Sequence, residues 1–308
     1  MSGHQHHGMG HGRQLKIAAV VTGAYFFFEL AVGLYTGSVM VLVDAAHTFS
    51  AVGGVVLALV ARRIARRPAS LSQTFGGQRA EIVGALMNGA ALLVMALVAM
   101  IMGGMRLMSP IEIPAAPMFI VALVGMLTEI WLIALMFRSQ KEDINTRGAF
   151  WHVVQTFLGS FGIIFAAGVI HFTGFMLIDP ILGMLFGLMV LYAAWSILRE
   201  SLSVLMEHAP EEPSVSEICE YLNALDGVRH VHHPHLWLLT SGKPIFSAHL
   251  RVDESLNLDQ LDALLKRAKT ALGERFSIYF STLQLELSEL DESEVAEIDV
   301  TGTGRESP

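Results

Sequence analysis

Long apolar segments alternate with short polar connections over the first two thirds of the chain. Each of six segments is close to the roughly 20 residues that an α-helix needs to cross about 30 Å of hydrocarbon. They lie at about residues 15–36, 39–61, 80–105, 115–137, 149–171 and 175–198. The connections after the first and fifth segments are very short, so both pairs are expected to form tight antiparallel hairpins. We therefore predict a membrane domain, an all-α six-helix bundle, over residues 15–205.

The pattern changes after Leu205 to shorter amphipathic elements. Helical periodicity at 214–225 and 257–272 alternates with β-like segments at 228–239, 244–252 and 277–287, in the order αββαβ. This order predicts a small α+β domain over residues 206–290, with its helices on one face of a three-stranded sheet. The final segment, residues 291–308, is acidic and contains Gly, Ser and Thr, and it is expected to be disordered.

Composition agrees with this division and excludes several classes of function. Hydrophobic types make up 53 % of the chain and charged types 16 %, whereas soluble domains carry about 25 % charged residues. The acidic excess lies in residues 211–308, which hold 18 Asp or Glu against 8 Lys or Arg. No basic stripe with interleaved aromatic residues is present, so no nucleic-acid partner is expected. Cys219 is the only cysteine, and no nucleophile–base pair, phosphate loop or HExxH motif indicates an enzyme.

Positive residues mark the cytoplasmic side of a membrane. They gather in the N-terminal segment and in the connections after the second and fourth spans: Arg13, Lys16, Arg62, Arg63, Arg66, Arg67, Arg79, Arg138, Lys141 and Arg147. The other three connections contain Arg106 and little else. We therefore expect an integral protein of the lipid bilayer, in a bacterial inner (plasma) membrane, with both termini and the acidic domain in the cytoplasm.

Two histidines lie inside different spans, where a polar side chain is costly and needs an account. His47 follows Asp44 by three residues, and His152 precedes Gln155 and Thr156 by three and four residues, so each group shares a helical face. Imidazole is the common ligand for zinc and related divalent ions. The two helices together are therefore candidates for a four-ligand metal site. The alternative is that a hydroxyl or carbonyl of a neighbouring helix satisfies each histidine.

Other polar residues in the spans have more than one interpretation. Glu29 and Glu129 are single mid-span carboxylates, with either a helix-packing or a proton-linked role. His171 and Asp179 lie near span ends, which favours an interfacial position.

Two more groups of histidines lie outside the spans. Residues 1–14 form a His-rich cytoplasmic tail, typical of metal capture, that contains His4, His6, His7 and His11. The first strand of the soluble domain carries His230, His232, His233 and His235, and the next strand carries His249. Residues two apart share a strand face, and His249 can approach them across a hairpin. These residues form either a cytoplasmic metal site or a chance cluster on a solvated strand.

Several segments, taken together, resemble the cation diffusion facilitator family of divalent-metal transporters over about residues 15–288. The resemblance rests on Gly37-Ser38 followed by Leu42-Val43-Asp44-Ala45-Ala46-His47, on Phe75-Gly76-Gly77-Gln78-Arg79-Ala80-Glu81 with Asn88, on Asn145-Thr146-Arg147-Gly148-Ala149 leading to His152 and Leu158-Gly159-Ser160, and on Asp179-Pro180-Ile181-Leu182. It implies a six-span homodimer with a cytoplasmic ferredoxin-like domain. Such proteins export zinc or similar divalent transition-metal ions from the cytoplasm, usually in exchange for protons.

The chain departs from this family at the residues expected to carry the ion. The family site is a His or Asp followed four residues later by Asp, once in the second span and once in the fifth. His47 and His152 match the first positions, but Ala51 and Thr156 stand at the partner positions. An ion in a low-dielectric interior needs compensating charge, so the resemblance implies a weaker or differently tuned site. Asp44 would then supply charge, and Gln155 or Thr156 a neutral oxygen.

The soluble domain departs from the family as well. His249 matches a metal-site position, while Phe280 stands in the last strand where many relatives carry a histidine. The cytoplasmic site is then either incomplete or rebuilt from the four histidines of the first strand.

Two functions follow from the sequence and remain open. One is proton-coupled efflux of a divalent cation, zinc first, by alternating access at His47 and His152. The other is a non-transporting metal sensor or partner subunit with the same fold, which the absence of both span carboxylates favours.

Overall fold

The computed structural model describes residues 7–137 and 144–288, with side chains described for all of these except residues 7–16, 51, 55, 58 and 144–149. The predicted disordered segment 291–308 lies outside the described residues, as do His4 and His6 of the histidine tail. The first helix begins at His7, so the backbone of tail residues 7–14 is helical.

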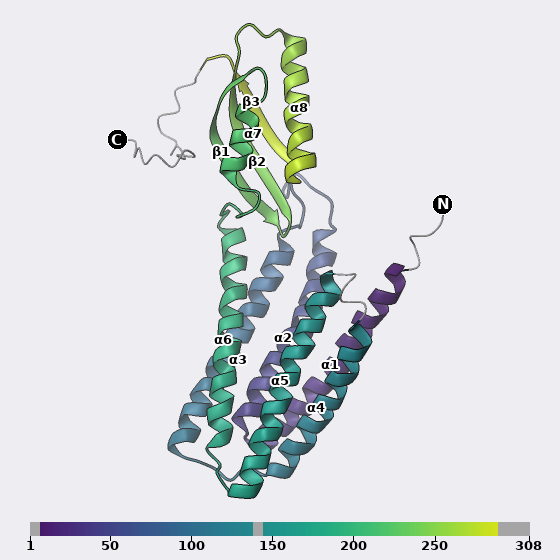
Figure 1. Cartoon of the computed structure of the whole chain (residues 1–308), viewed down its shortest axis with the longest axis vertical. Coiled ribbons are helices and arrows are strands. Elements are labelled where there is room, and N and C mark those ends of the chain that lie inside the picture. The colour runs from purple at the N-terminus through teal and green to yellow at the C-terminus, as the bar shows by residue number, and fades with distance from the viewer. Residues whose placement is uncertain (1–6, 138–143, 289–308) are drawn as a thin grey trace. The chain divides into compact units, whose positions relative to one another are not determined.

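Six long helices form the first unit of the chain (Figure 1). They are α1 (His7–Thr36), α2 (Val39–Ala65), α3 (Ala80–Met108), α4 (Ala115–Met136), α5 (Ile144–Thr173) and α6 (Ile178–Leu205). Each contains a stretch long and apolar enough to cross a membrane, which confirms the six predicted spans. Several helices continue past the predicted boundaries, and α6 reaches Leu205 instead of residue 198. Hydropathy marks the apolar part of a helix, whereas the backbone stays helical into the polar residues beyond it.

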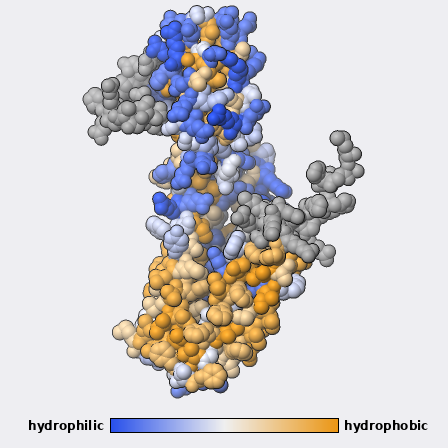
Figure 2. All heavy atoms as spheres, in the orientation of Figure 1, coloured by the Kyte–Doolittle hydropathy of each residue, from blue (hydrophilic) through white to orange (hydrophobic). Residues whose placement is uncertain are grey.

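Apolar residues dominate the face of these helices that Figure 2 shows. Phe27 of α1, Leu59 of α2 and Ile101 of α3 are all exposed in the structure. Continuous helices are suited to such surroundings, because their backbone polar groups are satisfied internally and need no water. The outer surface therefore matches lipid, and the chain is an integral membrane protein.

Asp179 of α6 holds the start of α2 in place. Its carboxylate is fully buried and accepts hydrogen bonds from the Ser38 hydroxyl, from the Val39 amide at 2.7 Å and from the Met40 amide at 3.3 Å. A carboxylate at a helix N-terminus satisfies amides that have no partner within the helix. Asp179 is thus a buried cap between two helices, which differs from the interfacial position expected from its place near a span end.

The C-terminal domain has the predicted order αββαβ (Figure 1). Its elements are α7 (Val215–Asn223), β1 (Val228–Thr240), β2 (Lys243–Val252), α8 (Leu258–Phe276) and β3 (Phe280–Glu286). The sheet order is β1-β2-β3, with β1 and β2 antiparallel and β2 and β3 parallel. The helices and the sheet enclose one apolar core, in which Leu222 of α7, Phe246 of β2 and Leu272 of α8 are fully buried.

Both helices of this domain begin at a capping residue. The Ser214 side chain accepts a hydrogen bond from the Glu217 amide at the start of α7. At the start of α8, the Asn257 side chain accepts from the Gln260 amide, and the Gln260 side chain accepts from the Asn257 amide. This reciprocal capping box satisfies two amides that a helix leaves unpaired at its N-terminus.

The basic connection between α2 and α3 belongs to the same compact unit as the C-terminal domain. Residues Ile64–Ile82 cluster with the described residues from Glu200 onward in this unit. The Gln78 side chain accepts a hydrogen bond from Lys243 Nζ at 2.9 Å, and Phe75 packs edge-on against Phe280 with ring centroids 6.4 Å apart. This connection is therefore a structural part of the second unit as well as a marker of membrane orientation.

Candidate metal sites

His47 of α2 and His152 of α5 face each other inside the helical unit. Their ring centroids are 4.7 Å apart, and His47 is 5 % exposed. Neither ring nitrogen of His47 has a hydrogen-bond partner among the described residues, and His152 Nε2 has none either. The alternative in which a neighbouring hydroxyl or carbonyl satisfies His47 is therefore not what the structure shows. Buried polar groups normally have partners, so two adjacent imidazoles without them form a candidate cation site.

Asp44 lies one turn before His47 on α2, but its carboxylate faces a different set of neighbours. A Cβ atom added to Gly159 of α5 would lie 2.3 Å from Asp44 Oδ1, so the carboxylate occupies space that the glycine leaves open. Asp44 also interacts with the carboxyl group of Glu29 on α1. All four carboxyl oxygens of Asp44 and Glu29 are buried, and the two carboxyl groups contact each other.

Thr156 and Gln155, the two polar neighbours of His152 on α5, differ in their burial. Thr156 is buried, and its hydroxyl donates to the Val153 carbonyl at 2.9 Å, a bond within its own helix. It lines a small cavity together with His152 and Glu129. Gln155 is exposed, so the structure does not bring it to the imidazole pair.

Glu129 of α4 is a mid-span carboxylate that the sequence analysis assigned to no site. It is 4 % exposed, its Oε1 accepts a hydrogen bond from the Ser160 hydroxyl at 3.1 Å, and its Oε2 has no partner in the described part of the chain. Glu129 lies beside Thr156 because of how α4 and α5 pack. The presence of a carboxylate in the middle of a span does not predict this packing. The available signal was the pair Thr156 and Ser160, which lie four residues apart and share a face of α5.

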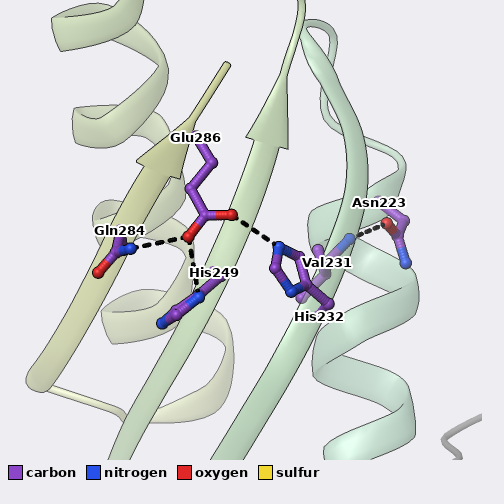
Figure 3. A network of polar contacts seen from close by, with 6 residues as sticks. All are labelled: Asn223, Val231, His232, His249, Gln284 and Glu286. Atoms are coloured by element: carbon purple, nitrogen blue, oxygen red, sulfur yellow. Dashed lines mark hydrogen bonds and ion pairs between the residues drawn. The ribbon is translucent and has the colours of Figure 1, made fainter. Parts of the chain in front are cut away.

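The second candidate site joins all three strands of the C-terminal domain (Figure 3). His232 of β1 and His249 of β2 are directly opposite each other in the antiparallel register. Glu286 of β3 lies between them: Oε2 is 3.0 Å from His232 Nε2, and Oε1 is 2.9 Å from His249 Nδ1. One ligand atom from each residue lies within 4.8 Å of the other two. The donor set of two imidazoles and one carboxylate suits zinc.

The other histidines of this group surround that core to different extents. A bulge lies between His232 and His235, and His233 within it has a φ of +47°. The ring of His233 approaches those of His232 and His249, with centroids 5.2 Å and 5.4 Å apart. His230 is exposed and stacks on His232 at 6.1 Å. His235 is also exposed.

The structure changes the expectation for the last strand. Phe280 pairs with Ile245 in the parallel register and packs on Phe75, so it lies far along the strand from the histidines. The residue that reaches them is Glu286, which was not predicted. Its side chain also accepts a hydrogen bond from Gln284 at 2.7 Å (Figure 3). The parallel register of β2 and β3 places Glu286 beside His249 and His232. The pattern of residues within a single strand does not predict that register.

The single cysteine takes no part in either site. Cys219 lies on the buried face of α7, and burial raises the pKa of its thiol to about 11. A thiol is a nucleophile or metal ligand only when deprotonated, so Cys219 acts as a small apolar core residue.

A membrane bundle with unpartnered imidazoles and carboxylates in its interior, followed by an αββαβ domain with a His–Glu cluster, defines a metal-cation transporter. The cation efflux transmembrane domain matches residues 15–206, and the cytoplasmic domain of cation efflux proteins matches residues 210–288. The chain therefore belongs to the cation diffusion facilitator family, whose members are transporters of metal cations and not enzymes.

Curated relatives match almost the whole chain. It is 34 % identical to the metal cation efflux system protein CzcD of Cupriavidus metallidurans over 96 % of this chain and 93 % of the relative. It is 30 % identical to a cadmium, cobalt and zinc/H(+)-K(+) antiporter of Bacillus subtilis over 92 % of each chain. It is 33 % identical to the zinc transporter ZitB of Escherichia coli over 89 % of this chain and 87 % of the relative.

Proposed function

We propose that this protein exports a divalent transition-metal cation from the cytoplasm in exchange for protons, with zinc as the first expected substrate. The observation that carries the proposal is the pair of facing imidazoles on α2 and α5, buried in the bundle with unpartnered ring nitrogens. An intramembrane group of this kind marks an ion pathway by default. The names of the three relatives, which refer to metal cation efflux, to cadmium, cobalt and zinc antiport and to zinc transport, support the same class of substrate.

The proposed cycle is alternating access around the imidazole pair. With the site open to the cytoplasm, neutral His47 and His152 bind the cation, and Asp44 offsets part of its charge. The bundle then opens to the other side, where protons compete for the imidazoles and the cation leaves. Histidine is suited to this exchange because imidazole ordinarily titrates between pH 5 and 8, and a ligand must lose its proton to bind metal.

The remaining assignments follow from charge and family. The positive residues of the connections favour cytoplasmic termini in a bacterial plasma membrane. The match to the cytoplasmic domain of cation efflux proteins favours a homodimer. The cluster of His232, His249 and Glu286 is proposed as a resident zinc site of that domain, and the histidine tail as a loose metal-capturing segment.

The test is zinc uptake into proteoliposomes under an imposed pH gradient. Wild-type protein is expected to accumulate zinc, and the double variant His47→Ala/His152→Ala to fall to the level of protein-free liposomes. His171→Ala is the matched control, because His171 is an exposed histidine of the same helix α5. Equal uptake by wild type and the double variant contradicts the proposal.

A non-transporting sensor or partner subunit is the second candidate, and the absence of carboxylates at Ala51 and Thr156 favours it. It predicts zinc binding by the full-length protein but no flux in the same liposomes. Under this candidate, Ala51→Asp/Thr156→Asp creates flux where the wild type has none. Flux by the wild type rejects it.

A further inference from the structure

Three carboxylates from three different helices are buried inside the membrane unit. Glu29 of α1 is 0 % exposed, Asp44 of α2 is 1 % exposed and Glu129 of α4 is 4 % exposed. Glu29 interacts with both Asp44 and Glu129. Among the residues that the structure describes, no lysine or arginine forms an ion pair with any of the three. Buried charges are normally paired, bound to a metal or neutralised by a proton. These groups can therefore hold protons when the interior is empty and offset the charge of a cation when one is bound.

Glu129 faces the same interior space as His152. His152, Thr156 and Glu129 line one small cavity, together with Thr48 of α2. The Ser160 hydroxyl binds one carboxylate oxygen of Glu129 from α5, which leaves Oε2 buried and without a described partner. Thr156 and Ser160 thus lie along one face of α5 beside Glu129. The carboxylate that α5 itself lacks at position 156 is therefore available from the neighbouring helix.

Two glycines make room for this polar interior. A Cβ atom on Gly125 of α4 would lie 2.8 Å from the Ser160 hydroxyl oxygen, and one on Gly159 would lie 2.8 Å from the carboxyl carbon of Asp44. Either contact is closer than packed atoms approach without displacement. The helices therefore pack closely around the carboxylates and exclude apolar side chains from the space between them.

The charge of a bound cation has to be offset inside the bundle. A divalent cation held only by two neutral imidazoles would retain its full charge in a low-dielectric interior, and an uncompensated buried ion is very costly. Positions 51 and 156 contribute no charge. We propose that Glu129, with Asp44 and Glu29 behind it, supplies the negative charge that those positions lack and completes the site of His47 and His152. The inference rests on the proposed function and names the remaining ligands of the same site.

This composition also bears on the kind of ion. Imidazole suits zinc, nickel and copper, whereas carboxylates suit magnesium, calcium and manganese. Adding carboxylates from α1, α2 and α4 to the imidazole pair gives a mixed nitrogen and oxygen set. Such a set is expected to accept borderline divalent ions, with zinc first.

The experiment measures equilibrium binding of Zn²⁺ to the full-length protein in detergent. His232→Ala/His249→Ala removes the cytoplasmic cluster from every sample, and alanine at the tail positions His4, His6, His7 and His11 removes the other proposed metal-binding segment. Binding in this background then reports the bundle. In this background, Glu129→Gln is expected to weaken Zn²⁺ binding by at least the roughly 10- to 100-fold that is typical when even an outer partner of a metal ligand is lost. Glu112→Gln, which removes an exposed carboxylate next to α4, is expected to leave binding unchanged.

A rescue variant keeps the test independent of folding. Glu129→Gln/Thr156→Asp places a carboxylate on α5 beside the lost one and is expected to restore Zn²⁺ binding to within a few fold of the parent, with a normal size-exclusion profile. A folded double variant that fails to bind Zn²⁺ overturns the inference. The inference is also overturned if Glu129→Gln binds Zn²⁺ with unchanged affinity while His47→Ala/His152→Ala abolishes binding. That result leaves the proposed function intact. If the histidine double variant still binds and transports zinc, the proposed function itself fails.

Discussion

The two histidine groups of this protein differ in what their imidazoles contact. In the bundle, His47 and His152 face each other, and neither ring nitrogen of His47 has a described partner. In the C-terminal domain, Glu286 lies between His232 and His249 at 3.0 Å and 2.9 Å. The first group leaves ring nitrogens without a described partner, whereas in the second a carboxylate on the adjacent strand contacts both imidazoles.

The difference has an energetic basis. A buried polar atom without a partner costs about 1–3 kcal/mol, so unpartnered groups persist where the surrounding helices hold them. That condition is suited to a transport site, which must bind and release its ion. The carboxylate between His232 and His249 removes most of that cost, as is typical of a site that retains its ion.

The largest expected effect is the loss of zinc flux when the histidine pair in the bundle is removed, compared with the smaller loss when the cytoplasmic pair is removed. His47→Ala/His152→Ala is expected to reduce zinc flux in proteoliposomes to background, because the variant removes the only described imidazole pair inside the bundle. His232→Ala/His249→Ala is expected to keep a large part of the flux, because the ion path remains intact. Zinc uptake under a pH gradient, measured for both variants side by side, checks the prediction. Equal loss in both would show that the cytoplasmic cluster is as essential to transport as the intramembrane pair.

Substitution of Gly159 tests whether close helix packing around Asp44 is needed for transport. Gly159→Ala puts a Cβ atom 2.3 Å from Asp44 Oδ1, and overpacking of this kind typically costs about 1–3 kcal/mol. We expect flux to fall as Asp44 is displaced from its position one turn before His47, by roughly tenfold for each 1.4 kcal/mol that the displacement removes from cation binding. Gly168→Ala on the same helix is the control, because a Cβ atom there meets nothing within 4 Å. Comparable flux in both variants would mean that the position of Asp44 is unimportant.

The cytoplasmic cluster is expected to respond to the loss of its carboxylate. Glu286→Gln removes the negative charge between the two imidazoles, so zinc affinity of the C-terminal domain should fall by about 10- to 100-fold. The domain should also lose about 1–3 kcal/mol of stability from the broken buried contacts. Zinc titration and thermal unfolding of the full-length protein measure both effects. Glu254→Gln, at an exposed position, controls for the change in net charge, and a matching effect there would reject the assigned role of Glu286.

The smallest expected effect concerns Cys219, which reports on the C-terminal domain alone. Burial raises the pKa of its thiol to about 11 from an ordinary value near 9, which lowers the thiolate fraction at pH 8 by about 100-fold. The neutral thiol is favoured in the folded state, so its contribution to stability is complete below pH 9 and is lost as the pH rises toward 11. Alkylation of the native protein at pH 8 should be slow and should accelerate on unfolding in urea. Rapid alkylation of the native protein would contradict the burial of this thiol.

Sequence patterns predicted the elements well where the pattern is local. Helix length and apolarity identified six spans, and the periodicities after Leu205 identified the order αββαβ, because both signals lie within one element. The same local signals misplaced the role of Asp179, which caps α2 from another helix. Its distance from the end of a span carries no information about that partner.

The candidate sites were only partly predictable, for the same reason. His47, His152, His232 and His249 were identified by residue type and position, and the structure brings each pair together. Glu286 was missed because its approach depends on parallel pairing of β3 with β2. The exposure of Gln155 depends on how α5 is rotated against its neighbours, which a spacing of three residues does not settle.

By itself, the sequence determined that the chain crosses a membrane six times, ends in an α+β domain and carries imidazoles where polar groups are costly. These properties depend on residues close together in the chain, whose periodicity and hydropathy act locally. Only the tertiary structure decided which carboxylates lie near the imidazoles. Glu129 lines a cavity with His152, and Glu286 lies between His232 and His249, although both carboxylates come from elements distant in sequence. Electrostatic compensation depends on distance in space, and packing between elements sets that distance.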